Sequence, residues 1–168
     1  MSASARKSVG HEYSARVIWE GNLGEGTSSY TGYGRQYRVL VDGKPDLAGS
    51  ADPAFRGEAD RHNPEDLFVA SLSACHMLFY LSLCARSGIR VVEYEDAARG
   101  VVTLDADGGG RFEKVTLRPV VTIAGPENEA LAGELHDAAH ELCFIANSCS
   151  VPIRVEATVD IHPGSRGT

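Results

Sequence analysis

The sequence predicts an α+β fold in which an antiparallel β-sheet packs around one long, buried helix. Two observations support this prediction: a helix pattern over residues 63–88 whose middle carries no charged side chain, and strand-like segments on both sides of it. At 168 residues the chain is long enough for one hydrophobic core and too short to expect two. We therefore predict a single domain over residues 1–168, with loose tails at residues 1–10 and 163–168.

Both ends of the long helix are marked in the sequence. Asn63 suits the N-cap, Pro64 the first helical position and Gly88 the stop. Because residues 67–85 carry no charge, we expect burial on most sides of the helix. That length also raises the question of a membrane span. Three serines, a histidine and the lack of a flanking basic cluster argue against a span, so we expect no membrane association.

The other elements are predicted from alternation, β-branched residues and turn residues. The segments with the character of strands are residues 13–19, 37–41, 90–106, 111–124 and 151–162. Residues 29–35 are interpreted as a loop or an edge strand, and residues 54–57 as a short strand. Residues 107–110 form a hairpin loop between two long strands. A second helix is expected over residues 127–142.

Composition excludes several classes of function. A net charge of −7 argues against nucleic acid as the main partner. The first ten residues lack the apolar stretch of a secretory signal. No strand ends in a glycine-rich turn that opens a helix, so we expect no nucleotide cofactor, and indeed no cofactor of any kind. Four cysteines without an export signal are expected to be reduced thiols in a cytoplasmic protein.

Cys75 lies in the middle of the long helix, next to His76. It is three turns from the N-terminus, so the helix dipole gives its thiolate little support. Burial in apolar surroundings would keep the thiol protonated and inert. For Cys75 to react, a cation must therefore approach from elsewhere in the fold. His76 points about 100° away around the helix and is a poor candidate.

The remaining cysteines differ in what they offer. Cys143, near the end of the second helix, could form a redox pair with a thiol on the other helix of the same core. Cys84 is nine residues from Cys75, about 13 Å along the helix axis, which exceeds disulfide reach. We therefore expect Cys84 to be a core residue. Cys149 has no evident partner.

A metal site is the lesser alternative. His136, His140 and Cys143 share one stripe of the second helix, and Cys75 or His76 could complete a zinc-type ligand set. The chain has no C-x-x-C pair, however, and such a stripe more often forms the edge of a core. We therefore expect no metal.

Three motifs together resemble the OsmC/Ohr family of osmotically inducible and organic hydroperoxide resistance proteins. They are Asn63-Pro64-Glu65-Asp66-Leu67, the segment Ser73-Ala74-Cys75, and Cys143 at the end of a later helix. The resemblance runs from about Trp19 to Val159. The family has a proline after its second cysteine, whereas this chain has Phe144, so the sequence is similar to a divergent OsmC-like branch.

The resemblance implies a thiol-dependent peroxidase that reduces organic hydroperoxides, and also hydrogen peroxide, in the oxidative stress response. Cys75 then matches the peroxidatic cysteine, Cys143 the resolving cysteine, and Glu65 the residue that holds an active-site arginine. Arg35 and Arg56 are both candidates for that arginine, which would favour the Cys75 thiolate and orient the peroxide. Cys75 would become a sulfenic acid and then a disulfide with Cys143, which a lipoyl-type or other dithiol reduces.

Helix geometry adds a prediction about assembly. Glu65 and Cys75 are ten residues apart, about 15 Å along the axis, so an arginine held by Glu65 hardly reaches Cys75 of the same chain. If two copies of the helix cross antiparallel at Ala70, Glu65 of one chain is level with Cys75 of the partner subunit. An apolar helix suits such a twofold interface. We therefore predict an intertwined, obligate homodimer with two shared active sites.

Two other classes of function remain open at the level of sequence. One is an OsmC-like protein that binds a metal or a small molecule without peroxidase turnover. The other is a structural dimer whose thiols are only buried.

Overall fold

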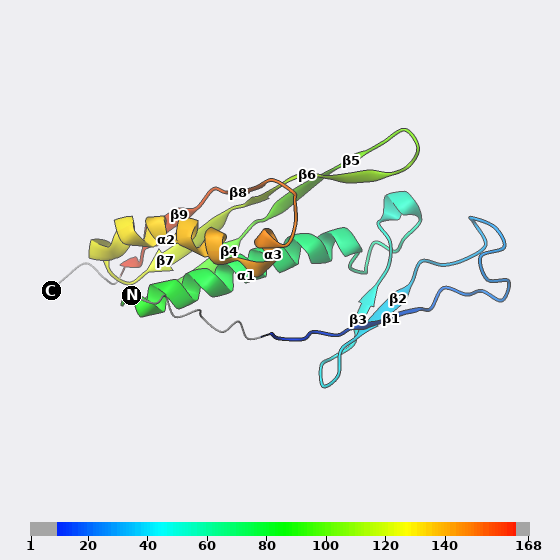
Figure 1. The fold of residues 1–168 in the computed structure, drawn as a ribbon, viewed down its shortest axis with the longest axis horizontal. Helices are drawn as coiled ribbons and strands as arrows, with labels where there is room; N and C mark the ends of the chain where they lie inside the picture. Colours follow the sequence, from blue (N-terminus) through cyan, green and yellow to red (C-terminus); the bar gives the residue numbers. More distant parts are fainter. Residues whose placement is uncertain (1–9, 164–168) are drawn as a thin grey trace, which may run out of the picture. The chain divides into compact units, whose positions relative to one another are not determined.

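The computed structural model describes residues 10–163, which form two compact units, one up to Pro64 and one from Glu65 onward (Figure 1). Except for Gly10 and Pro163, the tails predicted at residues 1–10 and 163–168 lie outside the described residues. The single domain over 1–168 stays a prediction.

The first unit is a three-stranded antiparallel sheet in the order β1-β2-β3. Its strands are β1 (Arg16–Trp19), β2 (Tyr37–Leu40) and β3 (Leu47–Gly49). The first two fall within predicted segments, whereas β3 lies in a stretch that is too polar and turn-rich to suggest a strand. Residues 29–35 form turns and bends without a strand.

The short strand predicted at residues 54–57 is wrong. Residues Pro53–Phe55 form a 3-10 helix, η1, and Arg56 follows with a left-handed backbone (φ 69°). The Asp52 carboxylate accepts a hydrogen bond from the Ala54 amide (2.7 Å), and Pro53 fixes φ at the first helical position. These local turn signals outweigh the strand propensity of Phe55.

The second unit holds one long helix, a second helix, two short helical segments and six strands. The helices are α1 (Pro64–Arg86), η2 (Pro126–Asn128), α2 (Glu129–Leu142) and α3 (Phe144–Asn147). The strands are β4 (Val91–Asp96), β5 (Arg99–Leu104), β6 (Gly110–Leu117), β7 (Pro119–Ile123), β8 (Ile153–Val155) and β9 (Thr158–Ile161). Each of the last three strands predicted from sequence is therefore interrupted and contributes to two sheets, ordered β4-β7-β9 and β5-β6-β8.

The prediction of a purely antiparallel sheet is wrong for the C-terminal strands. β4 pairs with β7 and β5 with β6 in antiparallel register, but β6 pairs with β8 and β7 with β9 in parallel register. The physical reason is the connection through α2 and α3, because a strand that returns after a helical crossover can run parallel to its neighbour.

Helix α1 has the predicted bounds. Gly88 adopts a left-handed conformation (φ 73°), and the amide of Ile89 donates to the carbonyl of Cys84 (2.9 Å), so the last turn is closed as expected at a glycine stop. Figure 1 shows α1 in green running along the strands of this unit, with α2 near its C-terminal half.

The burial of α1 is narrower than the sequence suggests. The buried side chains recur every fourth residue and are Leu72, His76, Tyr80 and Cys84. The opposite side is exposed and consists mainly of small or apolar residues, namely Ala70, Ala74, Leu78 and Ser82. The expectation of burial on most sides is therefore not met within one chain, because only one face of α1 has the sheets and α2 to pack against.

The buried stripe of α1 joins two hydrophobic clusters. Tyr80 and Cys84 pack with β7 and α2, through residues such as Val121 and Ala139. Leu72 packs with β6. By length and composition alone α1 could also cross a membrane, a test that core helices of soluble proteins pass too. In this structure the buried face of α1 is a core element between the sheets and α2.

Candidate functional site

Two thiols meet between α1 and the end of α2. Cys75 is half-buried in the middle of α1, and Cys143 is buried at the junction of α2 and α3. The two side chains lie close enough to interact electrostatically. Both cysteines are free thiols, as are Cys84 and Cys149. Two free thiols thus lie near each other, and their role as a redox pair stays a prediction.

The environment of Cys143 keeps its thiol protonated. Burial raises the pKa of Cys143 to about 11, and its interaction with Cys75 acts in the same direction. The amide of Ala146 donates to the Cys143 sulfur (3.5 Å) and opposes this shift, but burial outweighs it. At neutral pH the thiol of Cys143 therefore keeps its proton.

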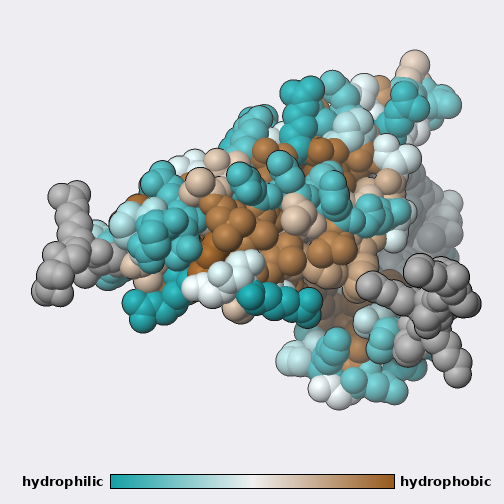
Figure 2. All heavy atoms as spheres, turned by 60° about the vertical axis from the view of Figure 1, so that its left-hand side comes forward, coloured by the Kyte–Doolittle hydropathy of each residue, from teal (hydrophilic) through white to brown (hydrophobic). Residues whose placement is uncertain are grey.

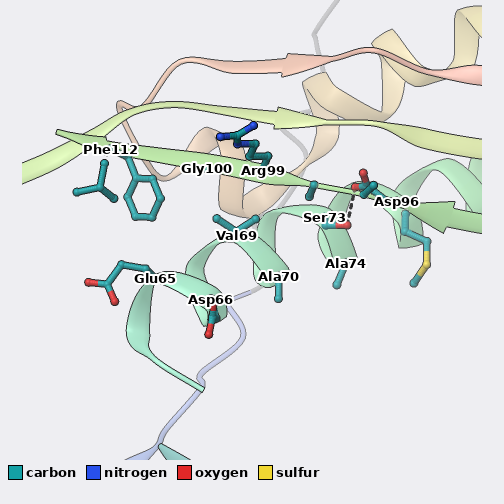
Figure 3. A pocket seen from close by; sticks show the side chains of 14 residues that line it. Glu65, Asp66, Val69, Ala70, Ser73, Ala74, Asp96, Arg99, Gly100 and Phe112 are labelled. Carbon is teal, nitrogen blue, oxygen red and sulfur yellow. Dashed lines mark hydrogen bonds between the residues drawn. The ribbon is translucent and has the colours of Figure 1, made fainter. Parts of the chain in front are cut away.

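Glu65 lies in the first turn of α1 and lines a hollow of about 630 Å³ beside β4 and β5 (Figure 3). Within residues 65–163 its carboxylate makes no ion pair. Cys75 does not line this hollow. The two residues thus belong to different parts of the helix, as the ten-residue spacing requires.

The hollow is shaped by a close approach of β5 to α1. Gly100 of β5 has no room for a side chain, because a Cβ there would meet the Phe112 ring at 2.5 Å and the Val69 side chain at 2.8 Å. On the same side Ser73 donates a hydrogen bond to Asp96 (2.5 Å), the dashed contact in Figure 3. Gly100 therefore lets β5 approach α1 closely, and the hydrogen bond between Asp96 and Ser73 ties β4 to α1 beside the hollow.

The two candidate arginines belong to the first unit, whereas the thiols and Glu65 belong to the second. Arg35 donates to the carbonyl oxygens of Tyr33 (2.5 Å) and Tyr30 (2.7 Å), and its guanidinium lies over both rings. Arg56 is exposed at the end of η1. Within residues 10–64 the Arg56 guanidinium forms no ion pair. Arg35 is thus held by its own loop, and of the two candidates Arg56 is the one whose guanidinium forms no ion pair within residues 10–64.

A buried pair of histidines begins at His76, the residue after Cys75 in α1, and the sequence does not predict this pair. The Nε2 atom of His76 lies 3.0 Å from Nδ1 of His136, and the two rings are stacked. The Tyr80 ring stacks on His136 in turn, with centroids 3.9 Å apart. Burial lowers the pKa of both histidines to about 4, so both are neutral at physiological pH. The sequence gives only a partial signal for this pair. His136 and Cys143 are seven residues apart on one face of the second helix, which suggests that His136 faces the same core as the thiols.

The predicted histidine stripe does not converge on a metal geometry in the described structure. His136 faces His76, and no group of three or more His, Cys, Asp or Glu side chains within residues 10–163 could hold a metal ion.

Comparison with known proteins decides the family. The family model described as OsmC-like protein matches residues 57–158, which include both thiols and Glu65. The chain belongs to the OsmC-like family. A search of curated protein sequences found no match.

Solved structures agree with this assignment. The OsmC-like chain is 34% identical to an OsmC-like protein of unknown function from Vibrio cholerae, with a TM-score of 0.77 over 88% of this chain and 99% of that one. An organic hydroperoxide resistance protein from Elizabethkingia anophelis is 21% identical (TM-score 0.66; 94% and 100% covered). The protein OhrB of Bacillus subtilis, also an organic hydroperoxide resistance protein, is 26% identical (TM-score 0.57; 88% and 98% covered). The mixed α+β fold is thus that of OsmC and Ohr structures.

Proposed function

We propose that this OsmC-like protein is a thiol-dependent peroxidase that reduces organic hydroperoxides through Cys75 and Cys143. The observation that carries the proposal is the close approach of the two thiols, one half-buried and one buried. Membership of a family that includes organic hydroperoxide resistance proteins supports the same chemistry.

The first step oxidises Cys75. Its thiolate sulfur attacks the terminal oxygen of the hydroperoxide, an S–O bond forms and the O–O bond breaks. The alkoxide takes up a proton and leaves as an alcohol, and Cys75 is left as a sulfenic acid. Two electrons pass from sulfur to the peroxide. Cys143 keeps its proton during this step, because burial raises its pKa.

The second step forms the disulfide. The Cys143 sulfur attacks the sulfur of Cys75, an S–S bond forms and the S–O bond breaks. The departing hydroxide combines with the thiol proton of Cys143 and leaves as water, so the raised pKa of Cys143 places the required proton at the site. A dithiol of the lipoyl type or another small dithiol then reduces the disulfide in the cytoplasm, where thiols are kept reduced.

The cation comes from an arginine held by Glu65 in a homodimer. Two α1 helices cross antiparallel at Ala70, so that Glu65 of one chain is level with Cys75 of the partner subunit. Support comes from the exposed side of α1, where Ala70 and Ala74 allow close approach and Leu78 is 63% exposed. Figure 2 shows hydrophobic side chains gathered at the surface on one face. Of the two candidates, Arg56 is preferred over Arg35 because its guanidinium forms no ion pair within residues 10–64.

The second candidate function is binding of a small apolar molecule without turnover. The hollow of about 630 Å³ beside Glu65 favours it, since Val69, Ala70 and Phe112 give it apolar walls. In the first function the same hollow is part of the dimer interface.

Steady-state turnover of cumene hydroperoxide with dihydrolipoamide separates the two functions. The wild-type protein consumes peroxide catalytically, Cys75→Ser abolishes turnover, and Cys143→Ser reduces it to a single oxidation of Cys75 that dimedone traps as sulfenic acid. Cys84→Ala is the matched control and retains turnover, since Cys84 is a buried core thiol. Turnover that survives Cys75→Ser, or a wild-type protein that consumes no peroxide, contradicts the peroxidase.

A further inference from the structure

Basic side chains gather on the face of the β5-β6-β8 sheet that is turned away from the core. Together with Thr116 and Val101 they line a hollow of about 290 Å³. The basic residues are Arg99, Lys114, Arg118 and Arg154.

Strand register places these side chains on one surface. Arg99 of β5 pairs with Thr116 of β6, and Thr116 pairs with Arg154 of β8, so the two arginines lie on either side of Thr116. Neighbouring strands are about 4.8 Å apart, which puts the two arginine Cα atoms about 10 Å apart. Lys114 is two residues before Thr116 and shares its face. Val115, between them, points into the core and is fully buried.

Charge in this hollow is not balanced by the protein. The chain carries a net charge of −7, yet four cations here face one carboxylate, Glu156, which is bound to Arg118 (3.0 Å). Across residues 10–163, Arg99, Lys114 and Arg154 form no ion pair. Like charges held close on one sheet face repel one another. Three uncompensated cations around one hollow are therefore an arrangement that an anion would stabilise.

Arg99 lines both this hollow and the hollow beside α1. In Figure 3 its guanidinium points away from Glu65 and Asp66 of α1. The Arg99 charge is thus directed away from the carboxylates of the α1 hollow.

We propose that this hollow, termed the basic sheet site, binds the phosphate group of a small, soluble phosphorylated compound that carries two or more negative charges. The planar forks of Arg99 and Arg154 match phosphate oxygens, and Lys114 adds a point charge. The volume suits one or two phosphate groups, with the rest of the compound in solvent. The site is separate from the Cys75–Cys143 pair and does not rest on the peroxidase function.

Calorimetric titration of the full chain with pyrophosphate tests the proposal at low ionic strength. We expect saturable binding with one pyrophosphate per chain. Arg99→Gln and Arg154→Gln each weaken the binding about tenfold or more, because each removes a charge-assisted, two-pronged contact. The matched control is Arg111→Gln, the same charge change on β6 outside the hollow, which alters the affinity less than about twofold.

Further measurements control for unfolding of the variants and for the source of the phosphate. Thermal melting establishes that every variant is folded, and Arg154→Lys, which keeps the charge without the fork, binds with intermediate affinity. Absence of pyrophosphate binding, or equal weakening by Arg111→Gln, overturns the proposal. Loss of pyrophosphate binding when an equal concentration of sulfate is added would also overturn the proposal, because the site would then not select phosphate. Vesicles containing phosphatidic acid distinguish the source of the phosphate, and sedimentation with them in the absence of pyrophosphate binding contradicts a soluble ligand.

Discussion

Asp96, at the end of β4, joins three parts of the second unit through its two carboxylate oxygens. One oxygen accepts from the Ser73 hydroxyl of α1 (2.5 Å), and the other accepts from the amide of Arg118 between β6 and β7 (2.6 Å). The strand is interrupted between β6 and β7 at Arg118, whose amide would otherwise have no hydrogen-bond partner in the sheet. Asp96 supplies that partner.

We predict that Asp96→Ala lowers the free energy of unfolding by about 2–3 kcal/mol, because two donors lose a charged acceptor. Urea denaturation measures this change. The neighbouring Glu95→Ala, in an exposed position on β4, is the control and changes stability by less than about 0.5 kcal/mol. Equal effects of the two substitutions would refute the role of Asp96.

At the same scale, the thiol pair shows what the sequence could and could not reveal. A redox pair of two helical thiols was one interpretation of the sequence, and the family resemblance supplied the roles of Cys75 and Cys143. No spacing rule by itself brings residues 68 positions apart together. The close approach of the two thiols and the burial of Cys143 depend on how α2 packs on α1. The sequence also could not show that the Arg35 side chain is held by its own loop, and the choice between Arg35 and Arg56 stays a prediction.

At the scale of elements, residues that act on their own turn predicted where a helix begins and ends. Pro64 and Gly88 act on their own turns, and the ends of α1 were predicted correctly for that reason. The parallel pairing of β8 and β9 was not, because strand direction follows from the path of the chain through α2. The breaks inside the long strands are likewise set by tertiary contacts such as that of Asp96 with Arg118.

Helices α1 and α2 are joined by the stacked pair of His76 and His136, which makes stability depend on pH. Both pKa values are lowered by burial to about 4 from an ordinary value of 6.5. The charge of His140 lowers the pKa of His76 further, and that of Asp96 raises it. Protonation therefore favours the unfolded chain, in which each histidine takes up its proton at higher pH.

We predict full stability above about pH 6.5 and a progressive loss as the pH falls from about 6.5 to about 4. Urea midpoints measured across this range provide the test. His136→Gln flattens the profile, whereas His11→Gln, at an exposed histidine, leaves its slope unchanged. A wild-type midpoint that is constant between pH 7 and pH 4.5 would show that the pair is not a buried neutral one.

At the scale of the whole molecule, the proposed active site needs two chains. One face of α1 is buried, and the opposite face, with Ala70, Ala74 and Leu78, is exposed. Glu65 is about 15 Å along the axis from its own Cys75. Reactivity of Cys75 would therefore be a property of the dimer.

Mixing inactive variants tests this sharing. Cys75→Ser and Glu65→Gln homodimers each lack one component of every site, but a mixed dimer has one site with an intact Cys75 and an intact Glu65 from the partner subunit. After subunit exchange we expect about one quarter of wild-type activity, since about half of the dimers are mixed and each has one working site. The double variant Cys75→Ser/Glu65→Gln mixed with Glu65→Gln is the control and recovers nothing. No recovery in the first mixture, with exchange established by mass, would contradict the crossed dimer.

The central claim, that Cys75 and Cys143 form one redox pair, is tested most directly by peptide mapping after one equivalent of cumene hydroperoxide. Non-reducing digestion followed by mass spectrometry identifies which cysteines are linked. The peroxidase predicts a disulfide between Cys75 and Cys143 of the same chain, which dihydrolipoamide reverses, with Cys84 and Cys149 left as thiols. An unmodified Cys75, or a Cys75 linked to any other cysteine, would contradict it.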